Sequence, residues 1–263
     1  MTDELQRRLL ESQAEGTLTH FSRHYPYPGR IIVVGLSEDG TKIHILYGLT
    51  GRSESTRNRI LVAKECGILS TEFADPSKAT GDPELLLYDA MMESLEDTQC
   101  IYVATNGRQT EELLDNGPVD EDFLGGWSYE PDSNSTPRIN AFVGIKLDDH
   151  LWYFGFSIFR KSLFNDSTEY KLHFYEEMEP GFGYGISTYR PPLRELIPEA
   201  YGEENPLTSF WGDPYMFPMK GTPEEVMRSF HRAFDGENFI SLAMKTIAVN
   251  TGESEMRVIN KYA

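Results

Sequence analysis

The chain has 263 residues, 39% of them hydrophobic and 12% aromatic, so it is long enough to bury one large core or two modest ones. Its 42 acidic and 24 basic residues give a formal net charge of −18 at pH 7. A field of that sign excludes nucleic acid and anionic membranes as the main partners, while a small anion can still bind where several arginines meet.

The first part of the chain is predicted to form one helix and one hairpin. An acidic cap followed three residues later by glutamine indicates a short helix over Asp3–Ala14, after which the chain is expected to be irregular as far as Pro28. The β-branched and aromatic runs Ile31–Val34 and Thr41–Leu49 flank an Asp-Gly turn. This pattern favours an antiparallel hairpin.

The middle of the chain is predicted to be rich in strands. The expected strands are Arg59–Ala63, Ile68–Phe73, Ile101–Ala104, Ile139–Leu147, Leu151–Phe159, Lys171–Glu176 and one that ends at Tyr189. Glu84–Met92 fits either a helix or a strand, and a short helix is expected over Gln109–Leu114. The irregular stretch Trp127–Arg138 lies between strands, and a loop of that length inside a domain usually carries function.

The C-terminal part is predicted to contain paired helices after the irregular connection Pro191–Pro218. Thr222, Pro223 and Glu225 form a helix start with a capping box, and Phe239–Val249 is expected to be a second helix before a closing strand. Many antiparallel strands followed by helices indicate an α+β fold. Strands that are apolar on both faces indicate sheets buried on both sides.

The cellular compartment is indicated by three features that the sequence lacks: a membrane span, a signal peptide and a disulfide framework. No apolar run approaches the length of a membrane span, and the N-terminal residues lack the apolar core of a signal peptide. The two cysteines, Cys66 and Cys100, are too few for a disulfide framework and fit reduced thiols. We therefore expect a cytoplasmic protein.

The segment Gly51–Arg59 is unusually dense in guanidinium, hydroxyl and amide groups for so acidic a chain. The order of PGRIIVVG, GRSESTRNR, LLLYDAM, VATNG, TPRI, GYGISTY and KGTPEEVMRSFHRAF resembles the cofactor-free IMP cyclohydrolase family of archaea and its bacterial homologues. The resemblance covers the chain from about Tyr27 to the C-terminal helices. It implies an N-terminal-nucleophile-hydrolase-like fold, a four-layer α-β-β-α sandwich of mainly antiparallel sheets. Residues 1–27 would be an N-terminal helical extension to a single domain, residues 28–263.

The implied reaction closes 5-formamidoimidazole-4-carboxamide ribotide to inosine monophosphate with loss of water, a step of purine biosynthesis. The enzyme must hold a near-attack conformer, stabilise charge on the formyl oxygen and move protons. None of this requires a metal, a cofactor or a covalent nucleophile, and we expect none. The expected partner is a small purine ribotide, with homo-oligomerisation possible.

Candidate site residues combine this resemblance with the chemistry of each side chain. The catalytic candidates are Arg30, Tyr47 and Asn106, and the substrate-binding candidates are Arg52, Ser53, Arg57, Asn58, Arg59, Gly107 and Arg138. Bidentate guanidinium groups suit phosphate and carbonyl oxygens. Each candidate also has a structural interpretation, such as a half-buried strand tyrosine at Tyr47 or a loop hydrogen bond at Asn58. The sequence leaves the general base open between Asp89 and Glu176.

Two alternative functions remain. One is a homologue that binds a purine ribotide without turnover. The other is an amide hydrolase of the same fold, in which Ser, Thr or Cys would begin a strand with its free α-amine as base. Thr2 opens a predicted helix and Gly29 stands at the predicted strand start, so this mechanism is disfavoured.

Overall fold

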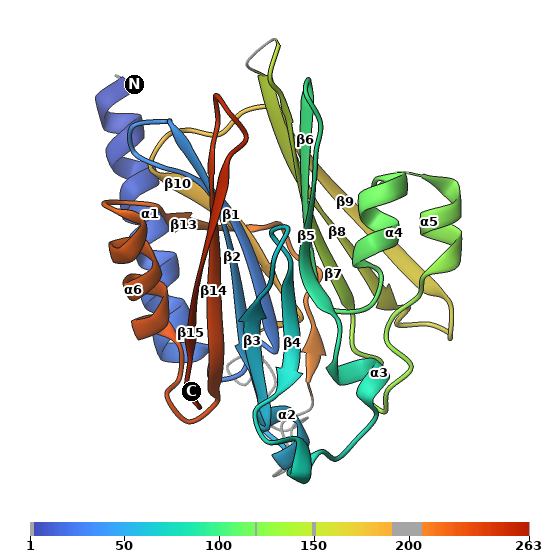
Figure 1. Ribbon diagram of the computed structural model, residues 1–263. Helices are drawn as coiled ribbons and strands as arrows, with labels where there is room; N and C mark the ends of the chain where they lie inside the picture. Colours follow the sequence, from blue (N-terminus) through green and yellow to red (C-terminus); the bar gives the residue numbers. More distant parts are fainter. Residues whose placement is uncertain (1–2, 119, 149–150, 191–206, 263) are drawn as a thin grey trace.

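The structure is a computed structural model that describes residues 3–118, 120–148, 151–190 and 207–262. Two antiparallel sheets pack face to face, and helices lie on the outer side of each sheet (Figure 1). The layer order is helix, sheet, sheet, helix. The expected α+β four-layer sandwich is therefore confirmed.

The first sheet has six strands in the order β13-β10-β1-β2-β14-β15, and all neighbours are antiparallel. Their bounds are β1 (Arg30–Leu36), β2 (Lys42–Thr50), β10 (Phe182–Ser187), β13 (Tyr215–Pro218), β14 (Phe239–Ala248) and β15 (Ser254–Asn260). The predicted hairpin is β1 and β2, with Ile32 opposite Tyr47 and the turn closed at Gly40. Gly40 has a φ of 70°, a conformation that favours glycine.

The second sheet has seven strands in sequential order, from β3 to β9. Their bounds are β3 (Arg59–Ala63), β4 (Leu69–Phe73), β5 (Asp89–Leu95), β6 (Gln99–Thr105), β7 (Arg138–Lys146), β8 (Leu151–Lys161) and β9 (Thr168–Tyr175). The short strands β11 (Tyr189–Arg190) and β12 (Thr208–Ser209) form a separate pair. Consecutive antiparallel pairing needs only short connections, so this sheet forms a meander.

Helices complete the outer layers. Their bounds are α1 (Asp3–His24), α2 (Glu54–Arg57), α3 (Pro83–Leu86), α4 (Thr110–Asn116), α5 (Glu121–Gly126) and α6 (Pro223–Ala233), with a 3₁₀ turn at Pro76–Lys78. The helices α1 and α6 cover the first sheet, and α4 and α5 lie on the second (Figure 1). The predicted start of α6 is confirmed, because Thr222 and Glu225 form a reciprocal capping box.

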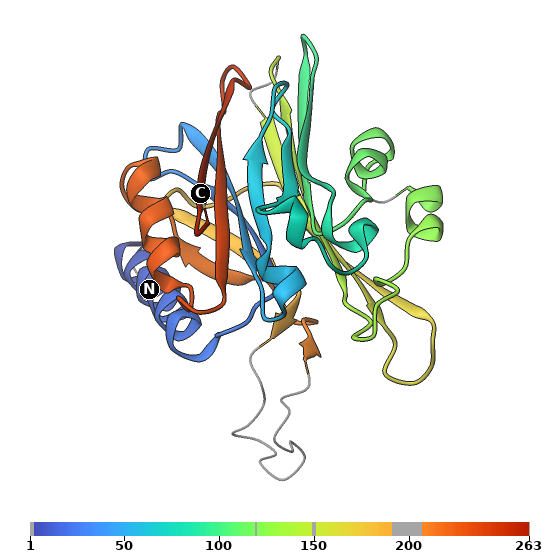
Figure 2. The ribbon, with the colours of Figure 1, turned by 60° about the horizontal axis from the view of Figure 1, so that its bottom comes forward.

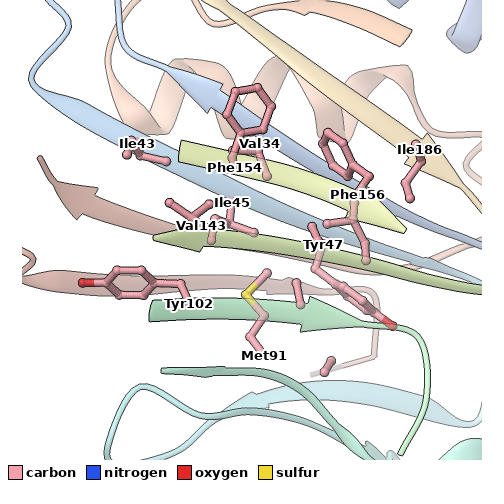
Figure 3. Packing of buried hydrophobic residues seen from close by; sticks show 14 of the residues in the cluster. Val34, Ile43, Ile45, Tyr47, Met91, Tyr102, Val143, Phe154, Phe156 and Ile186 are labelled. Atoms are coloured by element: carbon pink, nitrogen blue, oxygen red, sulfur yellow. The ribbon is translucent and has the colours of Figure 1, made fainter. Parts of the chain in front are cut away.

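The main core lies between the two sheets. Figure 3 shows Tyr47 and Ile45 of the first sheet facing Phe154, Phe156 and Met91 of the second. Residues on alternate positions of a strand share a face, so Arg30 lies on the same inner face of β1 as the core residues that follow it. The N-terminal end of β1 therefore directs a cation towards the space between the sheets.

The predicted end of the first helix is wrong. The helix α1 continues through Gly16 to His24, although glycine inside a helix costs about 1 kcal/mol relative to alanine. Phe21 and the adjoining Tyr25 are buried against the first sheet, in a cluster that includes Phe217. Tertiary packing of these aromatic residues offsets the local cost of the glycine, which residue preferences alone do not reveal.

The predicted second C-terminal helix is also wrong, because Phe239–Ala248 is strand β14, central between β2 and β15. Its residues are buried on both faces: Leu242 and Met244 contact the helix side, and Ala243 and Ile247 contact the inter-sheet core. A continuous apolar run has no period that separates a buried strand from a buried helix.

Three further predicted segments can be compared with the structure. Glu84–Met92 divides into the end of α3 and the start of β5, so both of its interpretations apply. The connection Pro191–Pro218 contains β12 and β13, which were not expected, and its residues 191–206 lie outside the described part. The stretch from Trp127 to Pro137 contains neither helix nor strand, as expected.

Candidate active site

The site begins at Arg30, the first residue of β1. It follows Gly29, whose φ of 75° lets the chain turn closely past the ring of Tyr189. The Arg30 residue is only 7% exposed. Its Nη2 pairs with the Glu130 carboxylate and donates to the carbonyl oxygen of Asn106 at 3.3 Å. Its Nε has no hydrogen-bond partner in the described structure.

Glu130 is the residue that sequence reasoning missed. It lies in the irregular loop Trp127–Arg138, is 3% exposed, and its Oε1 accepts from both Arg30 and the Nδ2 of Asn106, the latter at 3.1 Å. Burial raises the pKa of Glu130, and the Arg30 cation opposes that rise. The loop was identified from its length and composition. No periodic pattern indicates which carboxylate of an irregular loop turns inward.

Asn106 holds this loop against the sheet. Its Oδ1 accepts from the backbone N–H of Ile139 at 2.7 Å, and its Nδ2 also donates to the carbonyl oxygen of Pro137 at 2.9 Å. Together with the bond to Glu130, these contacts use both ends of the amide. The side chain of Asn106 therefore positions Glu130.

Arg138 and Gly107 form a second clamp on the same loop. The Nε of Arg138 donates to the carbonyl oxygen of Ser128, and its Nη1 donates to the Oε1 of Gln109, each at 2.9 Å. Its guanidinium also lies 4.9 Å from the ring centre of Trp127. A Cβ at Gly107 would lie 2.3 Å from the Nη1 of Arg138, so only glycine leaves room for this arrangement.

Arg59 and two tyrosines add the other polar groups near Arg30. Arg59 is 1% exposed; its Nε donates to the carbonyl oxygen of Thr56 at 3.1 Å, while its Nη1 has no partner in the described structure. Burial lowers the pKa of Arg59, and the nearby Arg30 cation adds to the lowering. The hydroxyls of Tyr47 and Tyr88 are 2.9 Å apart, and burial raises the pKa of Tyr47 well above its ordinary value.

These residues gather at one end of the sandwich. Arg59 begins β3 directly after α2, and α2 lies at the lower end of Figure 1, which Figure 2 turns forward. Arg52 lies at the rim of this cluster, with its guanidinium 4.5 Å from the ring centre of Tyr27. Tyr27 in turn stacks on Tyr189. The structure thus brings together Arg30, Tyr47, Arg59, Asn106, Gly107 and Arg138 of the predicted residues, with Arg52 beside them.

Three predicted residues make local structural contacts instead. Ser53 caps α2, and Asn58 exchanges hydrogen bonds with the backbone of Asp75 at 2.8 and 2.9 Å. Arg57 donates to the carbonyl oxygen of Gly51 and lines a separate cavity of about 510 Å³ with Asn58 and Asp75. None of these contacts involves Arg30 or Glu130.

The two carboxylates between which the sequence left the general base open form no hydrogen bond or ion pair with Arg30 in the described structure. Glu176 is exposed just beyond the end of β9. Asp89 accepts from the hydroxyl of Ser70 and lines a cavity of about 530 Å³ between β4 and the start of α4. In the described part of the chain, no three His, Cys, Asp or Glu side chains gather closely enough to hold a metal ion.

Fold and site together define a class: a four-layer α+β sandwich protein with a buried cluster of arginines, tyrosines and one glutamate at one end of the two sheets. The chain belongs to the family described as IMP cyclohydrolase-like protein, whose model matches residues 27–252. The matched region contains the whole cluster, and α1 precedes it. No curated protein matches the chain. No helix of the described ranges is long and apolar enough to cross a membrane.

Proposed function

We propose that the protein is an IMP cyclohydrolase that acts in purine biosynthesis, closing 5-formamidoimidazole-4-carboxamide ribotide to inosine monophosphate and water. One observation carries the proposal beyond family membership. Two buried guanidinium nitrogens, Nε of Arg30 and Nη1 of Arg59, have no hydrogen-bond partner in the described structure. A buried donor without a partner costs free energy, and an anionic or carbonyl-rich ligand supplies what these two donors lack.

The chemistry divides among the clustered residues. The carboxamide nitrogen attacks the formyl carbon and a C–N bond forms. The carboxamide nitrogen and the formamide nitrogen each lose one proton, the C–O bond of the carbinolamine breaks, and the former formyl oxygen leaves with both protons as water. Arg30 stabilises negative charge on that oxygen, and the hydroxyl of Tyr47, protonated at neutral pH like that of any tyrosine, is a second donor; burial raises its pKa further. Glu130 accepts the amide proton, a role that suits a carboxylate whose pKa is raised by burial.

The remaining residues orient these groups. Asn106 fixes the Glu130 carboxylate, and Arg138 with Gly107 fixes the loop that carries it. Arg59 binds the ribotide through its free Nη1, and Arg52 contributes at the rim. Because both reacting groups belong to one molecule, holding them in a near-attack conformer supplies much of the rate.

The test is to mix the protein with the formamido ribotide and follow the absorbance change as the purine ring forms. We expect turnover by the wild type and a loss of about 100-fold or more in Glu130→Gln, which keeps the shape but removes the proton acceptor. Absence of turnover in the folded wild type contradicts the proposal. Thermal stabilisation by inosine monophosphate without turnover would identify a ribotide-binding homologue instead.

An amide hydrolase of the same architecture is less well supported. The strand β1 begins with Arg30 after Gly29, so neither residue at its start offers a hydroxyl or thiol. An intact mass equal to that of the full chain, together with ring closure, would exclude processing to expose a nucleophile. A shortened chain with a new N-terminal Ser, Thr or Cys would favour the hydrolase.

A further inference from the structure

An exposed apolar surface lies on β9 and on the turn that precedes it. Tyr170, Leu172 and Phe174 occupy alternate positions on one face of β9 and are 44%, 44% and 53% exposed. In the β8–β9 turn, Leu163 is 78% exposed and Phe164 is 90% exposed. We call these five residues the β9 surface. Contiguous exposed apolar side chains of this kind usually mark an interaction site.

The backbone of β9 is also open to a partner. It is the last strand of the second sheet and pairs only with β8 among the described strands. An edge strand presents a row of free N–H and C=O groups that another strand can use. The edges of stable monomers are usually covered, bulged or very short, whereas β9 has 8 residues in unbroken register with β8.

We propose that β9 pairs antiparallel with β9 of a second copy of this chain, about a two-fold axis at Tyr170. In this register Glu169 lies opposite Lys171 of the partner subunit, and Lys171 lies opposite Glu169 of the partner subunit. Opposite charges on facing strand positions stabilise a pair, and a strand that complements itself in this way selects its own copy. The apolar turn of each copy then lies beside Phe174 of the other.

Electrostatic repulsion between two copies does not prevent this contact, although the chain as a whole is strongly acidic. Within the hairpin Arg160 pairs with Glu169 and Lys161 with Asp166, and Lys171 pairs with Asp213, which lies between β12 and β13. The charged side chains of β9 and of the turn before it are therefore compensated within the subunit, which limits the repulsion between two copies at these positions. Arg160 lies directly opposite Glu169 on the neighbouring strand β8. Glu169 therefore keeps this contact when a second copy pairs with β9.

The β8–β9 hairpin also forms hydrogen bonds with the loop that carries Glu130. The hydroxyl of Tyr170 donates to the carbonyl oxygen of Trp127 at 3.1 Å, and that of Tyr129 donates to the carbonyl oxygen of Asp166 at 3.2 Å. Trp127 and Tyr129 belong to the loop that carries Glu130. A second copy that covers Tyr170 holds this loop more firmly, so pairing and ring closure are coupled. This coupling, unlike the pairing itself, rests on the proposed function.

The pairing is tested on the full chain by light scattering coupled to gel filtration. The wild type is expected at twice the chain mass of 30.0 kDa, and Leu172→Glu at 30.0 kDa. Leu95→Glu is the matched control, because Leu95 is 56% exposed but lies on β5, away from the β9 surface; it should remain dimeric. A monomeric wild type, including one whose β9 surface is used by a different protein, overturns the proposal. A Leu172→Glu variant that remains dimeric also overturns it.

The register has its own test. Lys171→Glu and Glu169→Lys should each be monomeric, because each places like charges opposite one another, and circular dichroism checks that each is folded. An equimolar mixture of the two should form a heterodimer, since one strand is then acidic and the other basic. A folded mixture that stays monomeric contradicts the register.

The coupling is read from ring closure, and the two proposals fail separately. We expect Leu172→Glu to close the ring more slowly than the wild type, with Leu95→Glu unchanged. A dimeric wild type without turnover leaves the interface standing and removes the proposed function. A monomeric wild type with turnover does the reverse.

Discussion

Two buried ion pairs lie between the sheets in the described part of the chain, and they differ in how completely their hydrogen-bonding groups are satisfied. Lys245 is 1% exposed; its Nζ donates to the Oε2 of Glu93 at 2.5 Å and to the carbonyl oxygen of Gly67 at 2.7 Å. The hydroxyl of Ser254 donates to the same carboxylate oxygen. In contrast, the pair of Arg30 with Glu130 leaves the Nε of Arg30 without a partner among the residues that the structure describes.

Their places in the sheet differ as well. Lys245 lies opposite Ile45 on β2, whereas Arg30 lies opposite Leu49, nearer the end of the same strand. The two ion pairs are therefore both buried but have different roles. The pair at Lys245 is closed within the protein and joins the sheets, while the cluster at Arg30 and Arg59 keeps two buried donors without a partner in the described structure. Four predictions test this contrast, in order of expected size.

The largest effect is expected at the closed pair. Lys245→Met leaves Glu93 buried without its cation, so the free energy of unfolding should fall by about 3–5 kcal/mol in denaturant titrations. Adding Glu93→Leu should recover most of that loss, because both charges are then gone. Ring closure per folded molecule should be unchanged. A loss of ring closure in the stable double variant would contradict the contrast.

His44 tests whether a free buried nitrogen alone marks a site. It is fully buried, its Nδ1 lies 3.1 Å from the hydroxyl of Thr246, and its Nε2 has no partner in the described structure. Burial, aided by the Lys42 cation, lowers the pKa of His44 to about 4. We infer a neutral, structural imidazole.

The consequence is a loss of stability in acid. Between pH 6.5 and about 4 the unfolded chain binds a proton at this residue that the folded chain does not. Stability is therefore fully present above pH 6.5 and falls with pH, by about 3 kcal/mol at most. Unfolding measured across this window should show a weaker pH dependence in His44→Gln. An identical dependence in both proteins would contradict the lowered pKa.

Arg59 should behave in the opposite way to Lys245. Arg59→Met removes a buried guanidinium whose Nη1 has no partner within the described ranges, so the free energy of unfolding should change by no more than about 1 kcal/mol. Binding of inosine monophosphate, followed by calorimetry, should weaken about 10- to 100-fold, as expected for a lost charged hydrogen bond. Arg57→Ala is the control and should weaken binding by less than about 3-fold, within the error expected for surface changes.

The smallest effect is expected at Asn58. In the part of the chain that the structure describes, its side chain bonds only to the backbone of Asp75, so Asn58→Ala should lower the free energy of unfolding by about 1 kcal/mol. Affinity for inosine monophosphate should remain that of the wild type. A clear loss of affinity at unchanged stability would return Asn58 to the binding site.

Prediction from the sequence worked best where the signals were local. The hairpin of β1 and β2 and the start of α6 were located from turn and cap residues within a few positions of one another. Arg30 and Arg59 were singled out by residue type and by the resemblance. Asn58 and Ser53 carried similar signals, yet only their structural partners at Asp75 and Thr56 show that each is engaged locally.

The sequence by itself determined the acidic charge, the strand-rich α+β class and the arginines that can meet an anion. Tertiary structure decided which of those arginines share a site, because Arg30 and Glu130 are 100 positions apart and no local pattern joins them. It also decided that Phe239–Ala248 is a strand, since burial on both faces removes the periodicity by which a sequence distinguishes strand from helix.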